Sequence, residues 1–113
     1  MAVVRFGLIG YGAWGSHHAR AIAAVPGASL VAISARSEAN QKAAASAYPQ
    51  ARIFDDYRRL LDSEELDVVS VVLPTDMHFD VGCAVLNSGR HLLTEKPMAL
   101  SVDHCSQMIG LAA

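Results

Sequence analysis

The fold is decided by the stretch VVRFGLIGYGAWG, residues 3–15. Its first half, residues 3–9, is apolar almost throughout, and so short a run ending at a glycine is typical of a strand buried on both faces. Its second half matches the pattern Gly-x-Gly-x-x-Gly. Beyond it, Ala19, Ile22 and Ala23 recur at helical spacing, joined by His18, until Pro26 and Gly27 end the run. The stretch therefore predicts a strand, a glycine turn and a helix.

The rest of the chain repeats this alternation of strand and helix. Short apolar runs predict strands at 30–33, 52–54, 67–73 and 91–94, and polar–apolar periodicity predicts helices at 37–47, 55–61, 79–86 and 101–111. Ser37, Ser101 and either Thr75 or Asp76 are the expected N-caps, and Gly89 the expected end of a helix. Strict alternation predicts a three-layer αβα, doubly wound parallel sheet of about five strands, the Rossmann arrangement.

The glycine pattern predicts a dinucleotide site because it lies between a strand and a helix. Gly10 permits a tight turn, Gly12 lets the backbone approach a pyrophosphate, and Gly15 lets the helix lie close to the strand. The free N–H groups at the helix N-terminus then face the anion. Tyr11, Ala13 and Trp14 complete this predicted loop.

The end of the second strand favours NADP(H), while NAD(H) stays possible. An Asp or Glu there would accept hydrogen bonds from the ribose hydroxyls of NAD, but the sequence reads Ser34-Ala35-Arg36-Ser37. The Arg36 guanidinium can bind a 2′-phosphate through two charge-assisted hydrogen bonds, and both serines can donate to the same group. The alternative is a solvated Arg36 beside a helix-capping Ser37.

Two further segments follow strands and belong to the same edge of the sheet. Ligands of open α/β sheets bind beyond the carboxyl ends of the strands. Leu73, Pro74 and Thr75 follow the fourth strand, and Glu95 and Lys96 follow the fifth. Pro97 favours an extended conformation at Lys96, which would direct its side chain away from the sheet. The alternative for Glu95 and Lys96 is a surface ion pair before a turn.

Composition restricts the classes of protein that remain. The 113 residues fit one domain, 1–113, and the 52% of apolar residues excludes a disordered chain. A net charge of −2 argues against a nucleic-acid partner. Neither a metal-binding spacing nor a membrane-length apolar run is present, and the two cysteines, Cys83 and Cys105, are expected to be buried thiols. We expect a cytoplasmic protein without a signal peptide.

These motifs together resemble the glucose–fructose oxidoreductase, inositol dehydrogenase and rhizopine-catabolism (Gfo/Idh/MocA) family. The resemblance runs from GLIGYGAWG at 7–15, through FDDY at 54–57 and LPT at 73–75, to GRHLLTEKP at 89–97. It implies hydride transfer between a nicotinamide cofactor and a sugar, cyclitol or similar hydroxyl or carbonyl compound. By position, Lys96 resembles the family's catalytic lysine, with Glu95 beside it. His78 resembles a family histidine whose role is substrate contact, capping or structure.

The resemblance also implies a C-terminal substrate domain that residues 1–113 do not contain. We therefore expect this chain to bind cofactor without turnover. The fifth strand would be an exposed edge with apolar surface beside it, which predicts a homo-oligomer. The alternative function is a stand-alone NAD(P)-sensing module, although sensing needs no Lys96. A short-chain dehydrogenase is excluded because the Tyr-x-x-x-Lys pair is absent: Tyr57 is followed four residues later by Leu61, and neither Tyr11 nor Tyr48 is followed by lysine at that spacing.

Overall fold

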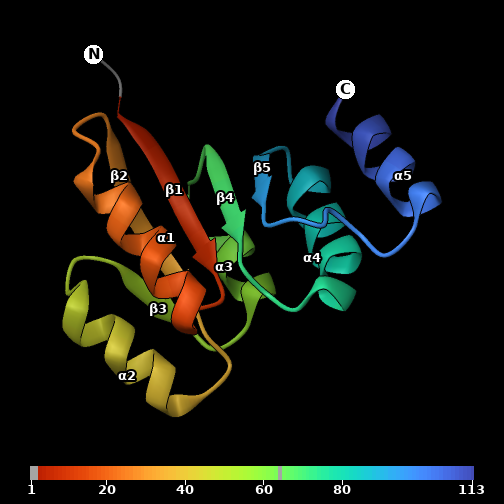
Figure 1. Cartoon of the computed structure of the whole chain (residues 1–113). Coiled ribbons are helices and arrows are strands. Elements are labelled where there is room, and N and C mark those ends of the chain that lie inside the picture. The colour runs from red at the N-terminus through yellow and green to blue at the C-terminus, as the bar shows by residue number, and fades with distance from the viewer. Residues whose placement is uncertain (1–2, 64) are drawn as a thin grey trace.

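A five-stranded parallel sheet forms the centre of the chain in a computed structural model that describes residues 3–63 and 65–113 (Figure 1). Its strands are β1 (Val4–Ile9), β2 (Ala28–Ser34), β3 (Arg52–Phe54), β4 (Val68–Val71) and β5 (His91–Thr94). They lie in the order β3-β2-β1-β4-β5, and every neighbouring pair is parallel. The chain thus winds outward from β1 to β3 and then returns to β4 on the other side. This doubly wound order confirms the predicted fold class.

Helices cover both faces of the sheet. They are α1 (Ala13–Ala24), α2 (Glu38–Ala47), α3 (Tyr57–Ser63), α4 (His78–Asn87) and α5 (Val102–Ala112), with a 3₁₀ turn at Thr75–Met77. α1 and α2 pack on one face, and α3 and α4 on the other. α5 packs against α4 at the end of the molecule next to β5 (Figure 1).

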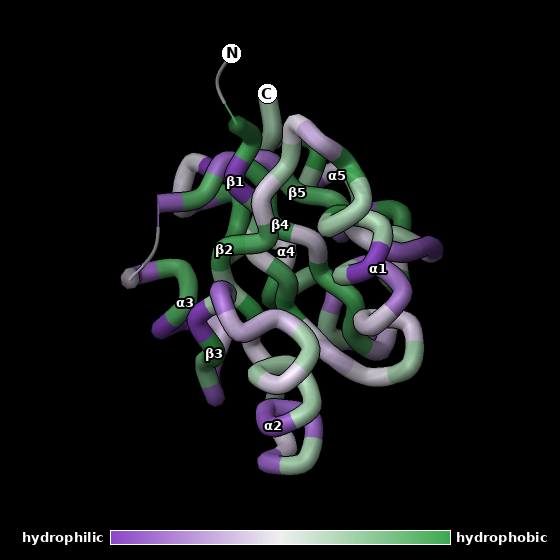
Figure 2. Tube along the Cα trace, turned by 90° about the vertical axis from the view of Figure 1, so that its left-hand side faces the viewer, coloured by the Kyte–Doolittle hydropathy of each residue, from purple (hydrophilic) through white to green (hydrophobic). Residues whose placement is uncertain are grey.

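The core is divided by the sheet because successive side chains of a strand point to opposite faces. Leu8 packs under α1 and α2, and Ile9 packs on the other side under α3 and α4. Hydrophobic residues therefore run through the central strands, while α2 and α3 carry many of the hydrophilic ones (Figure 2). Apolar burial at about 25 cal/mol per Å² is the main stabilising term for such a core.

Three helix ends match the sequence prediction. The Ser37 hydroxyl accepts from the Asn40 amide at 3.1 Å, and the Ser101 hydroxyl accepts from the His104 amide at 3.1 Å. Each serine thus caps its helix by accepting one of the unpaired amides of the first turn. Gly89 has φ +85° just after α4, where only glycine is free of strain.

Other local predictions were wrong. α1 begins at Ala13, inside the glycine pattern, rather than after Gly15. Neither Thr75 nor Asp76 caps α4, because the 3₁₀ turn intervenes and Met77 occupies the cap position without a side-chain bond. Ala23 is exposed, although Ala19 and Ile22 are buried as expected. The two cysteines are only half-buried: they lie on α4 and α5, at the end of the molecule next to β5, where their side chains are only partly covered.

No helix among the described residues is both long enough and apolar enough to cross a bilayer. The sheet order leaves β5 at an edge, as the sequence predicted. Large apolar side chains are exposed next to that edge, namely Leu93, Leu100, Val102, Ile109 and Leu111.

Candidate functional site

The glycine loop requires glycine at two of its three positions. Gly10 has φ +102°, and a Cβ there would lie 2.1 Å from the carbonyl oxygen of Val72. A Cβ at Gly15 would lie 2.2 Å from the carbonyl oxygen of Gly10, so α1 approaches the end of β1 as closely as its backbone allows. Gly12 differs, because nothing lies within 4 Å of the place where its Cβ would be. That open place is where another molecule can contact the backbone.

The N-terminus of α1 is suited to an anion. Its N-cap is Gly12, and no side chain among the described residues bonds to the amides of the first turn. These amides are left to an external acceptor, and the positive end of the helix dipole adds to the attraction. A pyrophosphate therefore fits this position, and the open side of Gly12 leaves room for it.

A cavity of about 670 Å³ adjoins the glycine loop at the carboxyl ends of β1, β2, β3 and β4. Its volume lies within the usual range for small-molecule and cofactor sites. Eight predicted site residues line it: Gly10, Tyr11, Gly12, Ser34, Arg36, Ser37, Leu73 and Pro74.

The cavity also has a wall that the sequence analysis did not assign to the site. Asn40, Met77 and the segment 55–58 line it, together with Ile9, Ala35 and Val72. Residues 55–58 directly follow β3, so the strand-end rule applied to β2, β4 and β5 would have selected them too.

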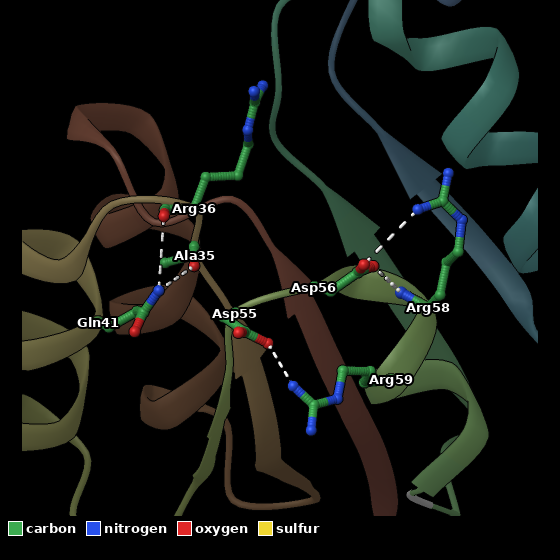
Figure 3. A network of polar contacts seen from close by, with 7 residues as sticks. All are labelled: Ala35, Arg36, Gln41, Asp55, Asp56, Arg58 and Arg59. Atoms are coloured by element: carbon green, nitrogen blue, oxygen red, sulfur yellow. Dashed lines mark hydrogen bonds and ion pairs between the residues drawn. The ribbon is translucent and has the colours of Figure 1, made fainter.

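The charges around the cavity leave one guanidinium without a carboxylate. Asp55 accepts a hydrogen bond from Arg59 Nη1 at 2.9 Å, and Asp56 pairs with the Arg58 guanidinium at 3.6 Å. Figure 3 shows both pairs. Arg36 extends away from both pairs, and its only described side-chain contact is Nη1 to Met77 Sδ at 3.9 Å. Its backbone is held instead, because the Gln41 amide donates to the Ala35 and Arg36 carbonyls. Arg36 thus presents a free cation on an anchored loop.

Two other cavity residues keep hydroxyl groups available. Ser37 Oγ already accepts from the Asn40 amide, which leaves its hydrogen free to donate. Partial burial raises the pKa of the Tyr11 hydroxyl, the nearby Tyr48 adds to the rise, and Arg20 opposes it. Tyr11 therefore stays neutral and can donate a hydrogen bond at physiological pH.

The remaining predicted residues lie outside this cavity, namely Ala13, Trp14, Gly15, Thr75, His78, Glu95 and Lys96. Trp14 is 70% exposed on the first turn of α1, with its ring 5.3 Å from that of His17. Glu95 and Lys96 follow β5 on the far side of β4 from β2. Because β1 and the start of α1 lie between β2 and β4, the edge divides into a β2–β3 side and a β4–β5 side.

His78 is held away from solvent and does not line the cavity. It is 1% exposed, with Nδ1 2.8 Å from the Pro97 carbonyl oxygen and Nε2 2.9 Å from the Leu73 carbonyl oxygen. The ring therefore joins the end of β4 to the segment after β5. Of the roles that the resemblance allowed, this geometry matches the structural one.

His18 is a residue whose contact the sequence analysis missed. Its Nε2 lies 2.5 Å from Glu95 Oε1, across 77 positions of sequence. Helical periodicity placed His18 near the packed side of α1, but it carries no information about a partner so distant in sequence. In the part of the chain that the structure describes, no group of three or more His, Cys, Asp or Glu residues could hold a metal ion.

Comparison with known proteins agrees with this architecture. Residues 4–113 match the family model described as "Oxidoreductase family, NAD-binding Rossmann fold". UDP-N-acetylglucosamine 3-dehydrogenase of Acidithiobacillus ferrooxidans is 36% identical over 112 residues, which are 99% of this chain and 34% of that protein. Inositol 2-dehydrogenase of Salmonella typhimurium is 31% identical over 108 residues, 94% of this chain and 32% of that protein.

A solved structure is similar as well. The WlbA dehydrogenase of Bordetella pertussis, in complex with NADH and UDP-GlcNAcA, has a TM-score of 0.91 and 31% identity, covering 97% of this chain and 34% of that one. The chain spans about a third of the length of each of these proteins. The family model covers nearly the whole of it, and the chain belongs to the Gfo/Idh/MocA oxidoreductase family as its NAD-binding Rossmann domain.

Proposed function

We propose that this chain is the cofactor-binding part of an oxidoreductase that moves a hydride between a nicotinamide and a carbinol or carbonyl carbon of a sugar, cyclitol or similar compound. The observation that carries the proposal is the uncapped N-terminus of α1 beside the open Gly12, next to a cavity of cofactor size. The pyrophosphate would lie on residues 10–15. The proposed substrate classes come from the names of two relatives: UDP-N-acetylglucosamine 3-dehydrogenase indicates a sugar, and inositol 2-dehydrogenase indicates a cyclitol.

The adenosine half of the cofactor belongs in the cavity on the β2–β3 side, and the nicotinamide half on the β4–β5 side. Dinucleotides lie across the point where the strand order reverses, with the pyrophosphate at the first helix, so the two halves extend in opposite directions from α1. Ser34, Arg36 and Ser37 would bind the adenosine ribose. Leu73, Pro74 and Thr75 would continue the site toward Glu95 and Lys96.

We propose that NADP(H) binds more tightly than NAD(H). Membership of the family does not decide this, since the similar WlbA dehydrogenase is described with NADH. The argument rests on Arg36, because Asp55 and Asp56 are paired with other arginines and no described carboxylate neutralises it. A 2′-phosphate would supply the missing anion through two charge-assisted hydrogen bonds.

Lys96 is the proposed catalytic residue. Its side chain is exposed beyond β5 and has no ion-pair or hydrogen-bond partner among the described residues. The bound nicotinamide supplies the hydride chemistry. Lys96 would donate a hydrogen bond to the reacting oxygen of the substrate or exchange a proton with it, while Glu95 stays beside it as an acceptor.

We propose further that residues 1–113 alone bind cofactor without turnover, and that copies of the chain associate through β5. Turnover needs a substrate held in place and an acid–base group beside it, and the described residues place no second titratable group in contact with Lys96.

The open strand edge and the exposed Leu93 and Leu100 are the surface for association. Light scattering at high concentration should give a mass above 12.0 kDa, and a monomer would reject this part. The free thiols Cys83 and Cys105 are consistent with a reducing, cytoplasmic location.

The test is to titrate the chain with NADPH and NADH while following Trp14, the one tryptophan of the sequence. We expect saturable quenching by both, with NADPH binding about tenfold or more tightly. In Arg36→Ala the preference should disappear while NADH binds as before. Binding of neither cofactor would reject the proposed function, and an unchanged preference in Arg36→Ala would reject the role of Arg36.

A further inference from the structure

The segment Glu95–Pro97 is held at both of its ends by histidines from two different helices. At one end the Glu95 carboxylate contacts His18 of α1, with 2.5 Å between Oε1 and Nε2. At the other end the Pro97 carbonyl oxygen lies 2.8 Å from Nδ1 of His78, the first residue of α4. Lys96 lies between these two contacts with an exposed side chain. The backbone around Lys96 is therefore fixed while its amine stays free.

The His18 contact crosses the face of the sheet on which α1 lies. In β5, Leu92 packs against the core under α4, so Leu93 points to the opposite face, where it is 47% exposed. Side-chain alternation then places Glu95 on the same face as Leu93, which is the face of α1. The His18 and Glu95 side chains are 20% and 41% exposed, so the contact is partly shielded from water. Shielding makes such a charge-assisted bond stronger than a surface ion pair.

The same helix carries the glycine loop at its N-terminus. α1 begins at Ala13, and the close approach at Gly15 fixes its position against the end of β1. His18 lies one helical turn after Gly15 on this fixed helix. A carboxylate only accepts hydrogen bonds, so the imidazole hydrogen of this contact lies on Nε2. His18 thus connects the phosphate-binding loop directly to the segment that contains Lys96.

We propose that His18 is a positioning residue, which holds Glu95 and Lys96 at a fixed distance from the phosphate loop so that the nicotinamide half of the cofactor meets a preformed surface. The inference rests on the proposed function, because it assumes that the nicotinamide lies on the β4–β5 side. It assigns His18 no contact with the cofactor. Instead, His18 keeps residues 95–97 ordered before the cofactor binds. Without His18, binding would have to order this segment, and the loss of conformational entropy would lower the affinity for the cofactor.

The experiment compares two ligands by calorimetry, NADPH and 2′,5′-ADP, because the second lacks the nicotinamide half. His18→Ala should weaken NADPH binding about tenfold and leave 2′,5′-ADP within twofold of the parent chain. His18→Gln, whose amide nitrogen can take the place of Nε2, should restore most of the NADPH affinity. His18→Asn, which is one methylene shorter, should not. His91→Ala is the matched control, since His91 is exposed at the opposite end of β5 and should leave both affinities unchanged.

A double-mutant comparison tests whether Glu95 is the partner through which His18 acts. In a Glu95→Ala background, His18→Ala should have no further effect on NADPH binding. If His18→Ala weakens the binding of both ligands equally, His18 only supports the fold. If a folded His18→Ala chain binds NADPH as tightly as the parent, the contact has no role. Either result overturns the inference. These outcomes are separate from failure of the proposed function, in which the unaltered chain would bind neither ligand.

Discussion

Gly12 and Gly15 belong to the same glycine loop but have different surroundings. Replacing each of them with alanine should therefore separate an effect on cofactor binding from an effect on folding. The added methyl at Gly12 meets nothing within 4 Å, and its φ of −90° suits any residue. Gly12→Ala should therefore fold normally and keep its melting temperature. The methyl would instead occupy the place where the pyrophosphate approaches the backbone. We expect NADPH affinity to fall roughly tenfold to hundredfold, which corresponds to about 1.4–2.7 kcal/mol.

Gly15→Ala should damage the fold itself. Its methyl would lie 2.2 Å from the Gly10 carbonyl oxygen and 2.9 Å from the Gly10 carbonyl carbon, both backbone atoms that no rotamer change can move. α1 must retreat by about 0.8 Å merely to reach 3.0 Å, the shortest distance that real Cβ atoms tolerate. Overpacking of this kind costs about 1–3 kcal/mol. For a domain of this size, each kcal/mol lost lowers the melting temperature by roughly 4 °C.

Circular dichroism melts and NADPH titrations of the two variants complete the comparison. The expected pattern is a stable Gly12→Ala that binds poorly and a destabilised Gly15→Ala that also binds poorly. If Gly12→Ala melts like the parent and binds NADPH equally well, the pyrophosphate does not lie over Gly12 and the placement of the whole cofactor is wrong. If Gly15→Ala melts like the parent, the close approach of α1 to β1 is wrong.

Three further outcomes follow from particular side chains. Ser70 Oγ is buried without a described hydrogen-bond partner, so Ser70→Ala should raise the free energy of unfolding by about 1 kcal/mol in urea titration; a loss of stability would show that the hydroxyl is satisfied. His78→Ala removes the buried ring that contacts the Leu73 and Pro97 carbonyls and opens a cavity, so the free energy of unfolding should fall by about 2–4 kcal/mol, and a change under 1 kcal/mol would contradict the tether. Burial raises the pKa of the Cys83 thiol, and the charge of Asp80 raises it further. The higher pKa lowers the fraction of thiolate at any given pH. In a Cys105→Ser variant, iodoacetamide should accordingly modify the Cys83 thiol at pH 8 more slowly than a peptide thiol of ordinary pKa, and the rate should rise at higher pH. An equal rate for the two thiols would refute the raised pKa.

The sequence contains enough information for the fold because its signals are local and agree with one another. Apolar runs, Gly89 and the caps at Ser37 and Ser101 each report their own segment, and the alternation of elements with right-handed crossovers then predicts a doubly wound parallel sheet. The strand order itself comes from the structure. The same local reasoning failed at Thr75. There a 3₁₀ turn separates the hydroxyl from the helix, and residue type alone does not distinguish an N-cap from a turn.

The candidate site was predictable only where it depends on strand ends. Gly10, Arg36 and Pro74 follow β1, β2 and β4, so topology alone brings them to one cavity. The pairings across that edge were not predictable. The spacing of Asp55 and Arg59, four residues apart, does suggest their local ion pair. Nothing in the sequence says that Arg36 has no described carboxylate beside it, nor that His18 reaches Glu95. These facts depend on distances between elements, which periodicity does not encode.

The two sides of the site differ in a way that assigns them different tasks. On the β2–β3 side a walled cavity with a free guanidinium offers area and charge, which are the sources of affinity. On the β4–β5 side Lys96 lies outside that cavity, and the backbone around it is tied by His18 and His78. Contacts on the β2–β3 side can therefore help to hold the reactive end of the cofactor against the β4–β5 side, because α1 belongs to both sides. A substitution at Arg36 should change which cofactor binds, whereas one at His18 should change how the far end of that cofactor is held.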